Sequence, residues 1–324
     1  MKVIEITNLC KDYQRKVIKP GLGGHVQAFF SPQVTKVPAV MNCTLSVQAG
    51  ERIAFLGPNG AGKSTVIKVL TGIIHRTSGD VKVLGLDPQK QQKQLSKKIG
   101  FVFGQRSQLQ MHLPARDSLQ LLGTMYDVSS AELDARIADL SKQLGVSELL
   151  GAPVRTLSLG QRIRFELMAS MLHKPEILFL DEPTIGLDIV AKGAIVDLIK
   201  HCANEYGTTI FMTSHDPSDI EKLCDRSIII DKGKLIIDES IAALKERYNV
   251  LKKLEVMTTE PYTFPTMSGV SVEYSNCKAE ISVNTELVPM SEVLKTVASA
   301  PCIRDMQVVN KSIEDILNDI YSHN

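Results

Sequence analysis

The chain has 324 residues, of which 44% are hydrophobic and 23% are charged, and its formal net charge is +1. This length exceeds the usual domain of about 100–200 residues, so we expect one large domain and a smaller one. The hydrophobic share suffices for a sizeable core and excludes global disorder. A net charge so close to zero provides no whole-chain attraction to nucleic acid or to an anionic membrane, and no nucleic-acid partner is expected.

No segment of the sequence resembles a membrane-spanning helix. Such a helix needs about 18 uncharged apolar residues, and runs such as Ile177–Leu180 are far shorter. The start, Met1–Leu9, alternates like a strand and lacks the pattern of a signal peptide, so we expect a cytoplasmic protein. No CxxC pair indicates zinc or redox chemistry. Reduced, buried thiols are expected at Cys10, Cys43, Cys202, Cys224, Cys277 and Cys302.

The first quarter of the chain predicts strands followed by a helix. Apolar and polar residues alternate in Val3–Thr7 and Cys43–Val47, which indicates a half-exposed antiparallel sheet. Arg52–Leu56 is a short apolar run that favours a core strand. Apolar residues then recur at helical spacing through Lys63–Ile74. The order is therefore strand, loop, helix.

The middle of the chain, from about Leu109 to Met171, has a helical pattern. Its clearest amphipathic stretch is Ala131–Leu144, with Ser129 or Ser130 as the cap. Afterwards short apolar runs alternate with helical segments, which indicates a largely parallel sheet. Its strands are expected at Ile177–Leu180, Thr209–Thr213 and Ser227–Asp231, and its helices at Ala191–Glu205 and Pro217–Cys224.

The C-terminal part has a different pattern, which is typical of a small α+β domain. This pattern begins after a helix around Ile241–Arg247. Strands are then predicted at Leu251–Thr258, Val270–Tyr274, Ala279–Val283 and Ile303–Val309, and helices at Met290–Ser299 and Ser312–Tyr321.

A phosphate-binding loop lies between the predicted core strand and helix. The motif G-x-x-x-x-G-K-[ST] is matched by Gly57, Pro58, Asn59, Gly60, Ala61, Gly62, Lys63, Ser64 and Thr65. Glycines let backbone N–H groups close around phosphates, and the helix N-terminus adds positive potential. Lys63 would reach the β and γ phosphates, and the Ser64 hydroxyl would bind Mg²⁺.

Two acids follow the apolar strand Ile177–Leu180. Asp181 and Glu182 would therefore lie at the carboxyl edge of the sheet, beside the phosphate loop. We expect Asp181 to hold Mg²⁺ through a water molecule. Glu182 would polarise the attacking water as general base.

Further short motifs resemble the ABC ATPases, over roughly Met1–Asp238. Leu157-Ser158-Leu159-Gly160-Gln161 looks like the ABC signature, and Pro183–Asp188 looks like the D-loop. Gln105 matches the Q-loop glutamine and His215 the switch histidine, in the family's order and spacing. Tyr13 occupies the position where the family places an aromatic ring against adenine.

The resemblance implies an α/β fold with four parts. They are a P-loop NTPase core, an antiparallel β subdomain, a helical signature subdomain at about residues 105–172, and a small C-terminal α+β domain. The ATP-binding domain would comprise residues 1–240 and the accessory domain residues 248–324. The expected substrate and cofactor are ATP and Mg²⁺.

The resemblance also implies that two chains pair head to tail, as a homodimer or as a heterodimer with a related ATPase. Each ATP would lie between one chain's phosphate loop and the other's signature, with Ser158, Gly160, Gln161 and Asp188 among the nucleotide contacts. Gln105 and His215 would sense the γ-phosphate, and Gln105 would also contact the metal. Hydrolysis would then open the dimer and move an attached permease.

Three features depart from the commonest family pattern. Leu159 stands where glycine is usual, and its side chain would oppose a positive φ angle. The Q-loop is one residue longer, which leaves Gln108 as an alternative to Gln105. A basic insertion at about residues 14–39 contains no acid and is expected to be a surface loop or a contact with membrane, permease or phosphate.

Together these departures resemble a bacterial exporter subgroup with separately encoded permeases. The leading hypothesis is thus an ATPase subunit that drives export, peripheral on the cytoplasmic face of the membrane. The alternative is a soluble ABC ATPase acting on ribosomes or DNA. Such proteins carry two nucleotide domains or a long coiled coil, and this sequence has one phosphate loop and no sustained heptads.

Overall fold

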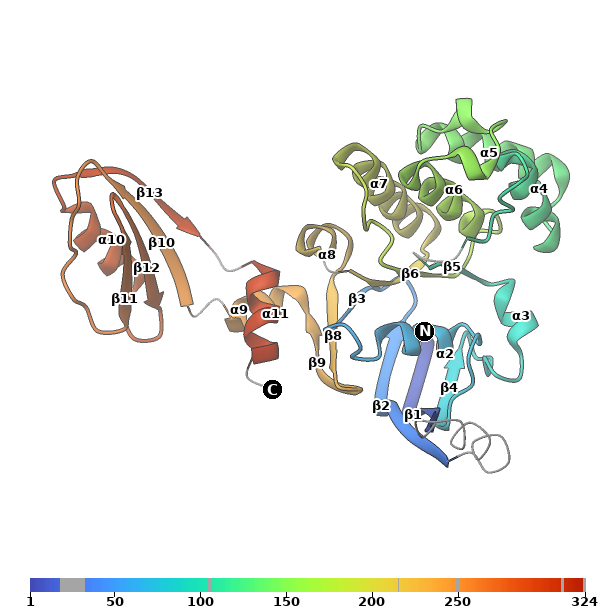
Figure 1. Cartoon of the computed structure of the whole chain (residues 1–324), viewed down its shortest axis with the longest axis horizontal. Helices are drawn as coiled ribbons and strands as arrows, with labels where there is room; N and C mark the ends of the chain where they lie inside the picture. Colours follow the sequence, from blue (N-terminus) through green and yellow to red (C-terminus); the bar gives the residue numbers. More distant parts are fainter. Residues whose placement is uncertain (18–32, 104–106, 215, 249–250, 310–311, 323–324) are drawn as a thin grey trace, which may run out of the picture. The chain divides into compact units, whose positions relative to one another are not determined.

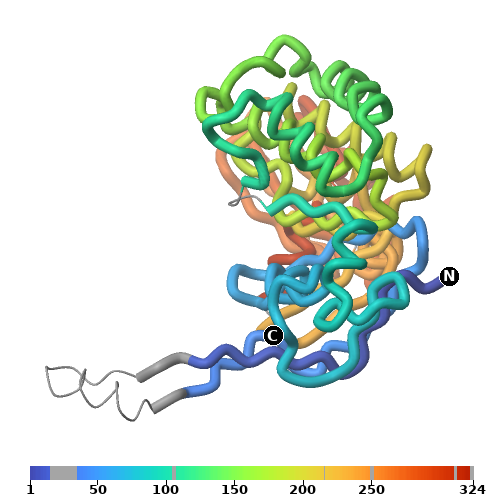
Figure 2. The backbone as a smooth tube through the Cα atoms, turned by 90° about the vertical axis from the view of Figure 1, so that its right-hand side faces the viewer, coloured from blue at the N-terminus to red at the C-terminus, as the bar shows by residue number. Residues whose placement is uncertain are grey.

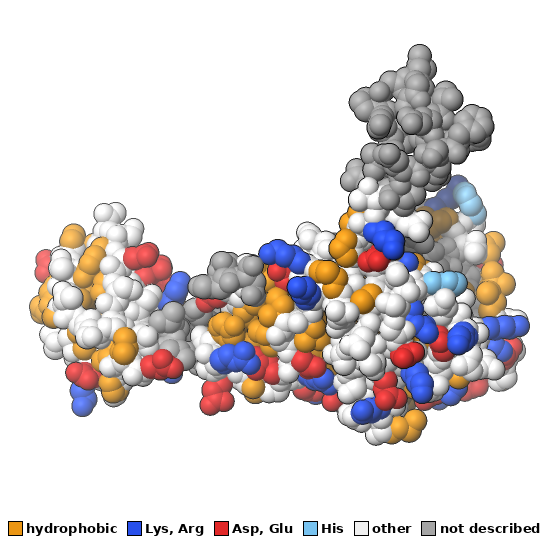
Figure 3. Space-filling model, turned by 90° about the horizontal axis from the view of Figure 1, so that it is seen from below, with side chains coloured by type: hydrophobic (Ala, Val, Ile, Leu, Met, Phe, Trp, Pro, Cys, Tyr) orange, Lys and Arg blue, Asp and Glu red, His pale blue; other side chains and the backbone are white. Residues whose placement is uncertain are grey.

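The computed structural model describes residues 1–17, 33–103, 107–214, 216–248, 251–309 and 312–322. Most of the basic insertion, Gln105 and His215 lie outside these ranges. The chain divides into two compact units, Met1–Asp238 and Glu239–Asn324, and each is described by itself. Basic and acidic side chains are interspersed over the face drawn in Figure 3, in keeping with the net charge of +1.

A six-stranded sheet forms the core of the first unit, in the order β5-β6-β7-β3-β8-β9 (Figure 1). The strands are β3 (Arg52–Leu56), β5 (Ile99–Phe103), β6 (Ile177–Asp181), β7 (Thr209–Thr213), β8 (Arg226–Asp231) and β9 (Lys234–Ser240). Strands β5, β6, β7, β3 and β8 pair in parallel, as predicted. Because β3 and β6 both run parallel to β7, the phosphate loop and the acid pair, which follow β3 and β6, lie at the same edge of the sheet.

A separate antiparallel sheet has the order β2-β1-β4, with β1 at Lys2–Val17, β2 at Gln33–Gln48 and β4 at Ser78–Val83. The first two strands run side by side far beyond their predicted ends (Figure 2). Their pairing continues from Tyr13 opposite Val37 to Val17 opposite Gln33. The expected surface loop is therefore wrong for residues 14–17 and 33–39, because cross-strand hydrogen bonds extend the hairpin there.

Helix α2 (Lys63–Leu70) follows the phosphate loop and ends four residues earlier than predicted. Thr71 donates its hydroxyl to the Ile67 carbonyl at 2.9 Å, and Gly72 then takes a φ of +74°. A β-carbon on Gly72 would lie 2.5 Å from the Pro88 carbonyl oxygen. The helix stops here because this close approach and the left-handed backbone both require glycine. The short helix α3 (Gln92–Ser96) precedes β5.

The helical part of the first unit contains α4 (Ala115–Met125), α5 (Ser130–Gln143) and α6 (Leu159–Met171). Between α5 and α6 lie the 3₁₀ turns η1 (Ser147–Leu149) and η2 (Val154–Thr156). Of the two serines expected to cap α5, Ser129 occupies the cap position, without a side-chain capping bond. Helices α7 (Ile189–Tyr206) and α8 (Pro217–Leu223) separate the later core strands.

The second unit contains a four-stranded antiparallel sheet in the order β11-β12-β10-β13. Its elements are α9 (Ile241–Tyr248), β10 (Leu251–Thr258), β11 (Val270–Ser275), β12 (Lys278–Asn284), α10 (Met290–Ala298), β13 (Ile303–Val309) and α11 (Ile313–Ser322). Alternate residues of β10 and β12, such as Leu254 and Ile281, form its core with Val293 and Val297 of α10. This periodicity explains why the sequence predicts the strands well.

All six cysteines are free thiols. Four of them are buried, as expected. Cys10 is half-buried and Cys277 is exposed, so burial was predicted wrongly for these two.

Candidate functional site

The phosphate loop lies between β3 and α2, and at two of its glycines the backbone leaves no room for a side chain. A β-carbon on Gly57 would lie 2.2 Å from the Ile230 carbonyl oxygen. Gly62 has a φ of +111°, and its β-carbon would lie 2.5 Å from the Ala39 carbonyl oxygen. Only glycine fits at both positions. The loop therefore packs its backbone tightly against β8 and β2.

Lys63, the first residue of α2, is buried, with 6% of its surface exposed. Its Nζ donates to the Gly57 carbonyl at 2.5 Å and to the Pro58 carbonyl at 3.2 Å. Burial lowers the pKa of Lys63, and the charges of Glu182 and Asp181 partly oppose that shift. A cation held by carbonyls inside a loop at a helix N-terminus attracts an anionic group.

The acid pair lies at the end of β6, where Thr213 of β7 holds both residues. The Thr213 hydroxyl donates to Asp181 Oδ1 at 2.7 Å, and the backbone N–H of Glu182 donates to Thr213 Oγ1 at 3.1 Å. Glu182 has a φ of +54°. This left-handed conformation costs about 1–3 kcal/mol in a non-glycine residue, and such strain concentrates at functional sites.

The signature segment begins α6. Ser158 is the N-cap, and it forms a reciprocal capping box with Gln161. The Gln161 backbone N–H donates to Ser158 Oγ at 3.3 Å, and the Ser158 backbone N–H donates to Gln161 Oε1 at 2.9 Å. The Ser158 hydroxyl accepts from the Gln161 N–H, so its own hydrogen stays available to an anion. Leu159 is the first helical residue and does not have a positive φ. The expected conflict with its β-carbon is therefore wrong, because a helical residue needs no glycine.

The D-loop packs against this signature in the same chain. A β-carbon on Gly186 would lie 3.3 Å from Leu159 Cδ2, and one on Gly160 would lie 3.4 Å from Leu187 Cδ2. Asp188 caps α7 by accepting the Ala191 N–H at 2.8 Å. The structure therefore brings the predicted signature and D-loop residues together.

Tyr13 projects from β1 toward the phosphate-loop helix. Its hydroxyl lies 3.4 Å from Thr65 Oγ1, and Lys11 Nζ lies 5.1 Å from the ring centroid. The side chain is 40% exposed. An exposed ring beside the loop can stack on a planar base.

Of the two candidate Q-loop glutamines, the structure describes Gln108 and not Gln105. Gln105 lies outside the described residues. Gln108 donates its side-chain amide to the Phe101 carbonyl at 2.8 Å and its backbone N–H to Glu166 at 3.0 Å. These bonds tie Gln108 to β5 and α6.

Glu166 is a residue that sequence reasoning missed. It is 5% exposed on α6, and it also accepts a hydrogen bond from the Ser107 hydroxyl. Burial raises the pKa of Glu166, while these hydrogen bonds lower it. A single acid in the otherwise apolar stretch Phe165–Met168 was the signal available in the sequence.

His215, the predicted switch residue, lies outside the described residues, but its neighbours are placed. Thr213 ends β7 opposite Asp181 in the sheet register. Asp216 is the N-cap of α8, and its backbone N–H donates to Ser214 Oγ at 3.0 Å. The segment that contains position 215 thus begins beside the acid pair.

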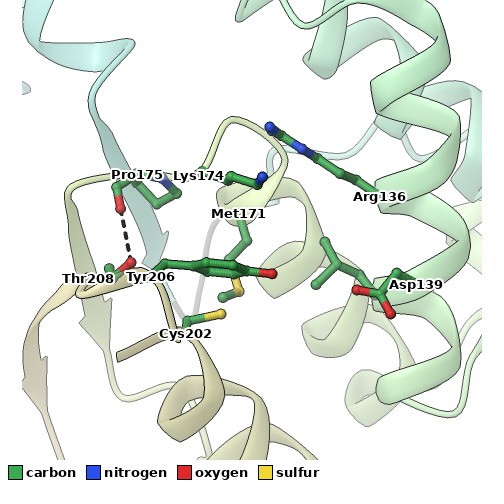
Figure 4. A pocket seen from close by; sticks show the side chains of 9 residues that line it. Arg136, Asp139, Met171, Lys174, Pro175, Cys202, Tyr206 and Thr208 are labelled. Carbon is green, nitrogen blue, oxygen red and sulfur yellow. Dashed lines mark hydrogen bonds between the residues drawn. The ribbon is translucent and has the colours of Figure 1, made fainter. Parts of the chain in front are cut away.

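A separate cavity lies among α5, α6 and α7, and Figure 4 shows Tyr206 at its centre. Lys174 Nζ lies 5.6 Å from the Tyr206 ring centroid. The cavity has room for only about 30 Å³, which suits a water molecule and not a nucleotide. No predicted site residue lines it.

Comparison with known proteins agrees with the geometry of the phosphate loop and acid pair. Residues 40–185 match the family described as "ABC transporter". The chain is 32% identical over 217 residues to the ABC transporter ATP-binding protein NatA of Bacillus subtilis, covering 67% of this chain and 88% of NatA. It is 29% identical over 272 residues to the daunorubicin resistance ATP-binding protein DrrA2 of Streptomyces coeruleorubidus, covering 84% of each.

The linearmycin resistance ATP-binding protein LnrL of Bacillus subtilis is 37% identical over 201 residues, which cover 62% of this chain and 64% of LnrL. Among solved structures, the dimeric structure of MJ0796, a bacterial ABC transporter cassette, superposes with a TM-score of 0.61 at 27% identity. That match covers 74% of this chain and 98% of the cassette. A further structure of MJ0796 is described as a post-hydrolysis state, with a TM-score of 0.61 and 26% identity over the same shares of each chain.

These likenesses confirm the predicted P-loop ABC fold and the predicted ATPase activity. The chain belongs to the ABC transporter family and is an ATP-binding, ATP-hydrolysing subunit of an ABC transporter.

Proposed function

We propose that this chain drives the export of a substrate through a separate membrane permease. In this proposal the phosphate loop binds ATP, Tyr13 stacks on adenine and Glu182 acts as the general base. The observation that carries the ATP-hydrolysing part of the proposal is Lys63, whose buried ammonium is held in the loop by the Gly57 and Pro58 carbonyls. The charges of Glu182 and Asp181 raise its pKa against the effect of burial. A cation and two acids around one loop suit phosphate transfer to water.

Mg²⁺ would be held by Ser64 and Asp181, with Gln105 as a third contact. Among the described residues no group of three or more His, Cys, Asp or Glu side chains forms a metal site. This donor set suits Mg²⁺, which keeps several waters and binds through one or two protein groups and substrate phosphates. Bound with ATP, Mg²⁺ would neutralise part of the phosphate charge.

We further propose that two ATPase chains pair head to tail, with Ser158, Gly160, Gln161 and Asp188 facing the partner's nucleotide. Exposed apolar side chains near the signature and D-loop support this pairing: Leu159, Ile185, Ile189 and Val190. Their exposure is 43–89%. Apolar side chains that project this far gain free energy when a partner covers them.

The permease would dock near the Q-loop, beside the helical part of the first unit. Apolar side chains are also exposed there, at Met111, Leu113, Leu121 and Met125. Within the described ranges, no helix has the length and apolar character needed to cross a membrane. We place the ATPase on the cytoplasmic face, and propose export because two relatives are named as resistance proteins. Residues 248–324 would form an accessory domain.

The test is light scattering after size exclusion on Glu182→Gln protein, with and without ATP and Mg²⁺. Glu182→Gln keeps the shape of the side chain but removes the base, so ATP should bind, turnover should fall at least about 100-fold and a dimer should accumulate. Glu176→Gln, which replaces an acid directly before β6, is the matched control and should turn over ATP normally. Normal turnover by Glu182→Gln would contradict the base assignment, and bound ATP without dimer would contradict self-pairing.

A further inference from the structure

A buried polar network lies beneath the D-loop. Asp219 of α8 is completely buried, and its Oδ2 accepts the Thr184 hydroxyl at 2.5 Å. Its Oδ1 lies 3.1 Å from Lys192 Nζ of α7. A carboxylate without exposure is costly unless it is paired, so these two contacts hold the D-loop, α7 and α8 together.

The same lysine extends the network to the segment around position 215. Lys192 Nζ also pairs with Asp216, the N-cap of α8. Asp216 Oδ1 accepts the Ser218 N–H at 2.9 Å, which fixes the first turn of that helix. The residue that directly follows position 215 is therefore anchored to α7.

At its other end the network reaches the strained turn that carries Glu182. Thr184 is two residues beyond Glu182, whose φ is +54°. Thr213 binds the Glu182 N–H on one side, and the Thr184–Asp219 bond restrains the chain on the other. A strained residue keeps its conformation only when its surroundings restrain it in this way.

We propose that Thr184, Lys192 and Asp219 are positioning residues for ATP hydrolysis, which keep the Glu182 turn in one arrangement against α7 and α8. This inference rests on the proposed role of Glu182. The three side chains act on the reaction through Glu182 and not through the nucleotide. Their loss should therefore slow the chemical step and leave ATP binding unchanged.

The experiment compares the steady-state ATPase kinetics of Thr184→Val and Asp219→Asn with those of the wild-type chain. Valine keeps the shape of threonine and removes the hydroxyl. We expect kcat to fall about 10–100-fold with KM for ATP within about twofold of wild type. Thr184→Ser restores the hydroxyl and should restore kcat.

Thr208→Val is the matched control, because its hydroxyl is also buried and donates to the Pro175 carbonyl at 3.1 Å before the opposite end of β7. It should keep the wild-type kcat. The double variant Thr184→Val/Asp219→Asn should lose less than the product of the two single effects, because the two side chains meet in one hydrogen bond. A double variant that lost the product of both single effects would overturn the network.

Measuring Glu182→Gln in parallel distinguishes a failure of the positioning network from a failure of the base assignment. If Glu182→Gln nearly abolishes turnover while Thr184→Val keeps the wild-type kcat, the positioning network is wrong and the base assignment stands. If Glu182→Gln turns over ATP normally, the base assignment itself fails. If Asp219→Asn does not fold, Thr184→Val and its serine rescue decide the question, and a rise in KM without a fall in kcat would overturn the inference.

Discussion

The carboxylate of Glu166 accepts the backbone N–H of Gln108 at 3.0 Å. This bond joins the signature helix α6 to the segment that follows the Q-loop, across 58 residues of sequence. Glu166 lies eight residues after Ser158, about 12 Å along the same helix. The contact therefore links the segment around Gln108 to the helix that begins at the signature.

Two substitutions of Glu166 distinguish the effect of its hydrogen bonds on stability from the effect of its charge. Glu166→Ala leaves the Ser107 hydroxyl and the Gln108 N–H without their acceptor, and should lower the free energy of unfolding by about 1–3 kcal/mol. Glu166→Gln keeps an acceptor and avoids burying a charge, so we expect it to be close to wild type. Urea unfolding measures both. Equal stability of the alanine and wild-type proteins would contradict the contact.

Lys63→Ala should weaken ATP binding itself. Truncating one member of a buried charge pair costs about 2–5 kcal/mol, so affinity should fall at least about 30-fold. Isothermal titration or a fluorescent ATP analogue measures this loss. Lys68→Ala, on the same helix α2, is the matched control and should bind normally. Unchanged affinity of Lys63→Ala would require a different nucleotide site.

Ile189→Asp tests the apolar surface beside the D-loop. Ile189 is 89% exposed, so the substitution should leave the fold and ATP affinity unchanged. A charge buried without a partner in an interface is unfavourable, and ATP-dependent dimerisation should weaken at least about tenfold. Sedimentation on the Glu182→Gln background measures dimerisation. Leu287→Asp, also exposed but in the second unit, is the control. If both variants dimerise equally well, Ile189 lies outside the interface.

The ion pair between Arg76 and Asp87 predicts how stability depends on pH. Two hydrogen bonds of 2.9 Å join them, and the Arg76 guanidinium lowers the pKa of Asp87 from 3.8 to about 2. A lowered folded-state pKa stabilises the protein above the unfolded pKa, and this contribution disappears as pH falls from about 4 to 2. The stability difference between wild type and Asp87→Asn should therefore be constant from pH 7 to 5 and shrink below pH 4. A difference that grew on acidification would contradict the assignment.

The sequence predicted the phosphate loop, the acid pair and most strands because their signals are local. Gly57–Thr65 match one continuous motif, and Leu254 and Ile281 lie in strands with period-two burial. The end of α2 was predicted wrongly, since apolar spacing continues to Ile74 while Gly72 turns the backbone. The length of β1 and β2 was also missed, because pairing between strands depends on the partner strand.

The sequence by itself determined the family, the ATP-binding loop and the two acids, because each depends on residues adjacent in the chain. Only the tertiary structure decided that Glu166 accepts the Gln108 backbone N–H and that Leu159 starts a helix beside Gly186. The same holds for Asp219, which accepts a hydrogen bond from the hydroxyl of Thr184, 35 residues earlier in the chain. Such contacts follow from how helices and strands pack around the sheet, and no periodicity along the chain encodes which distant side chains meet.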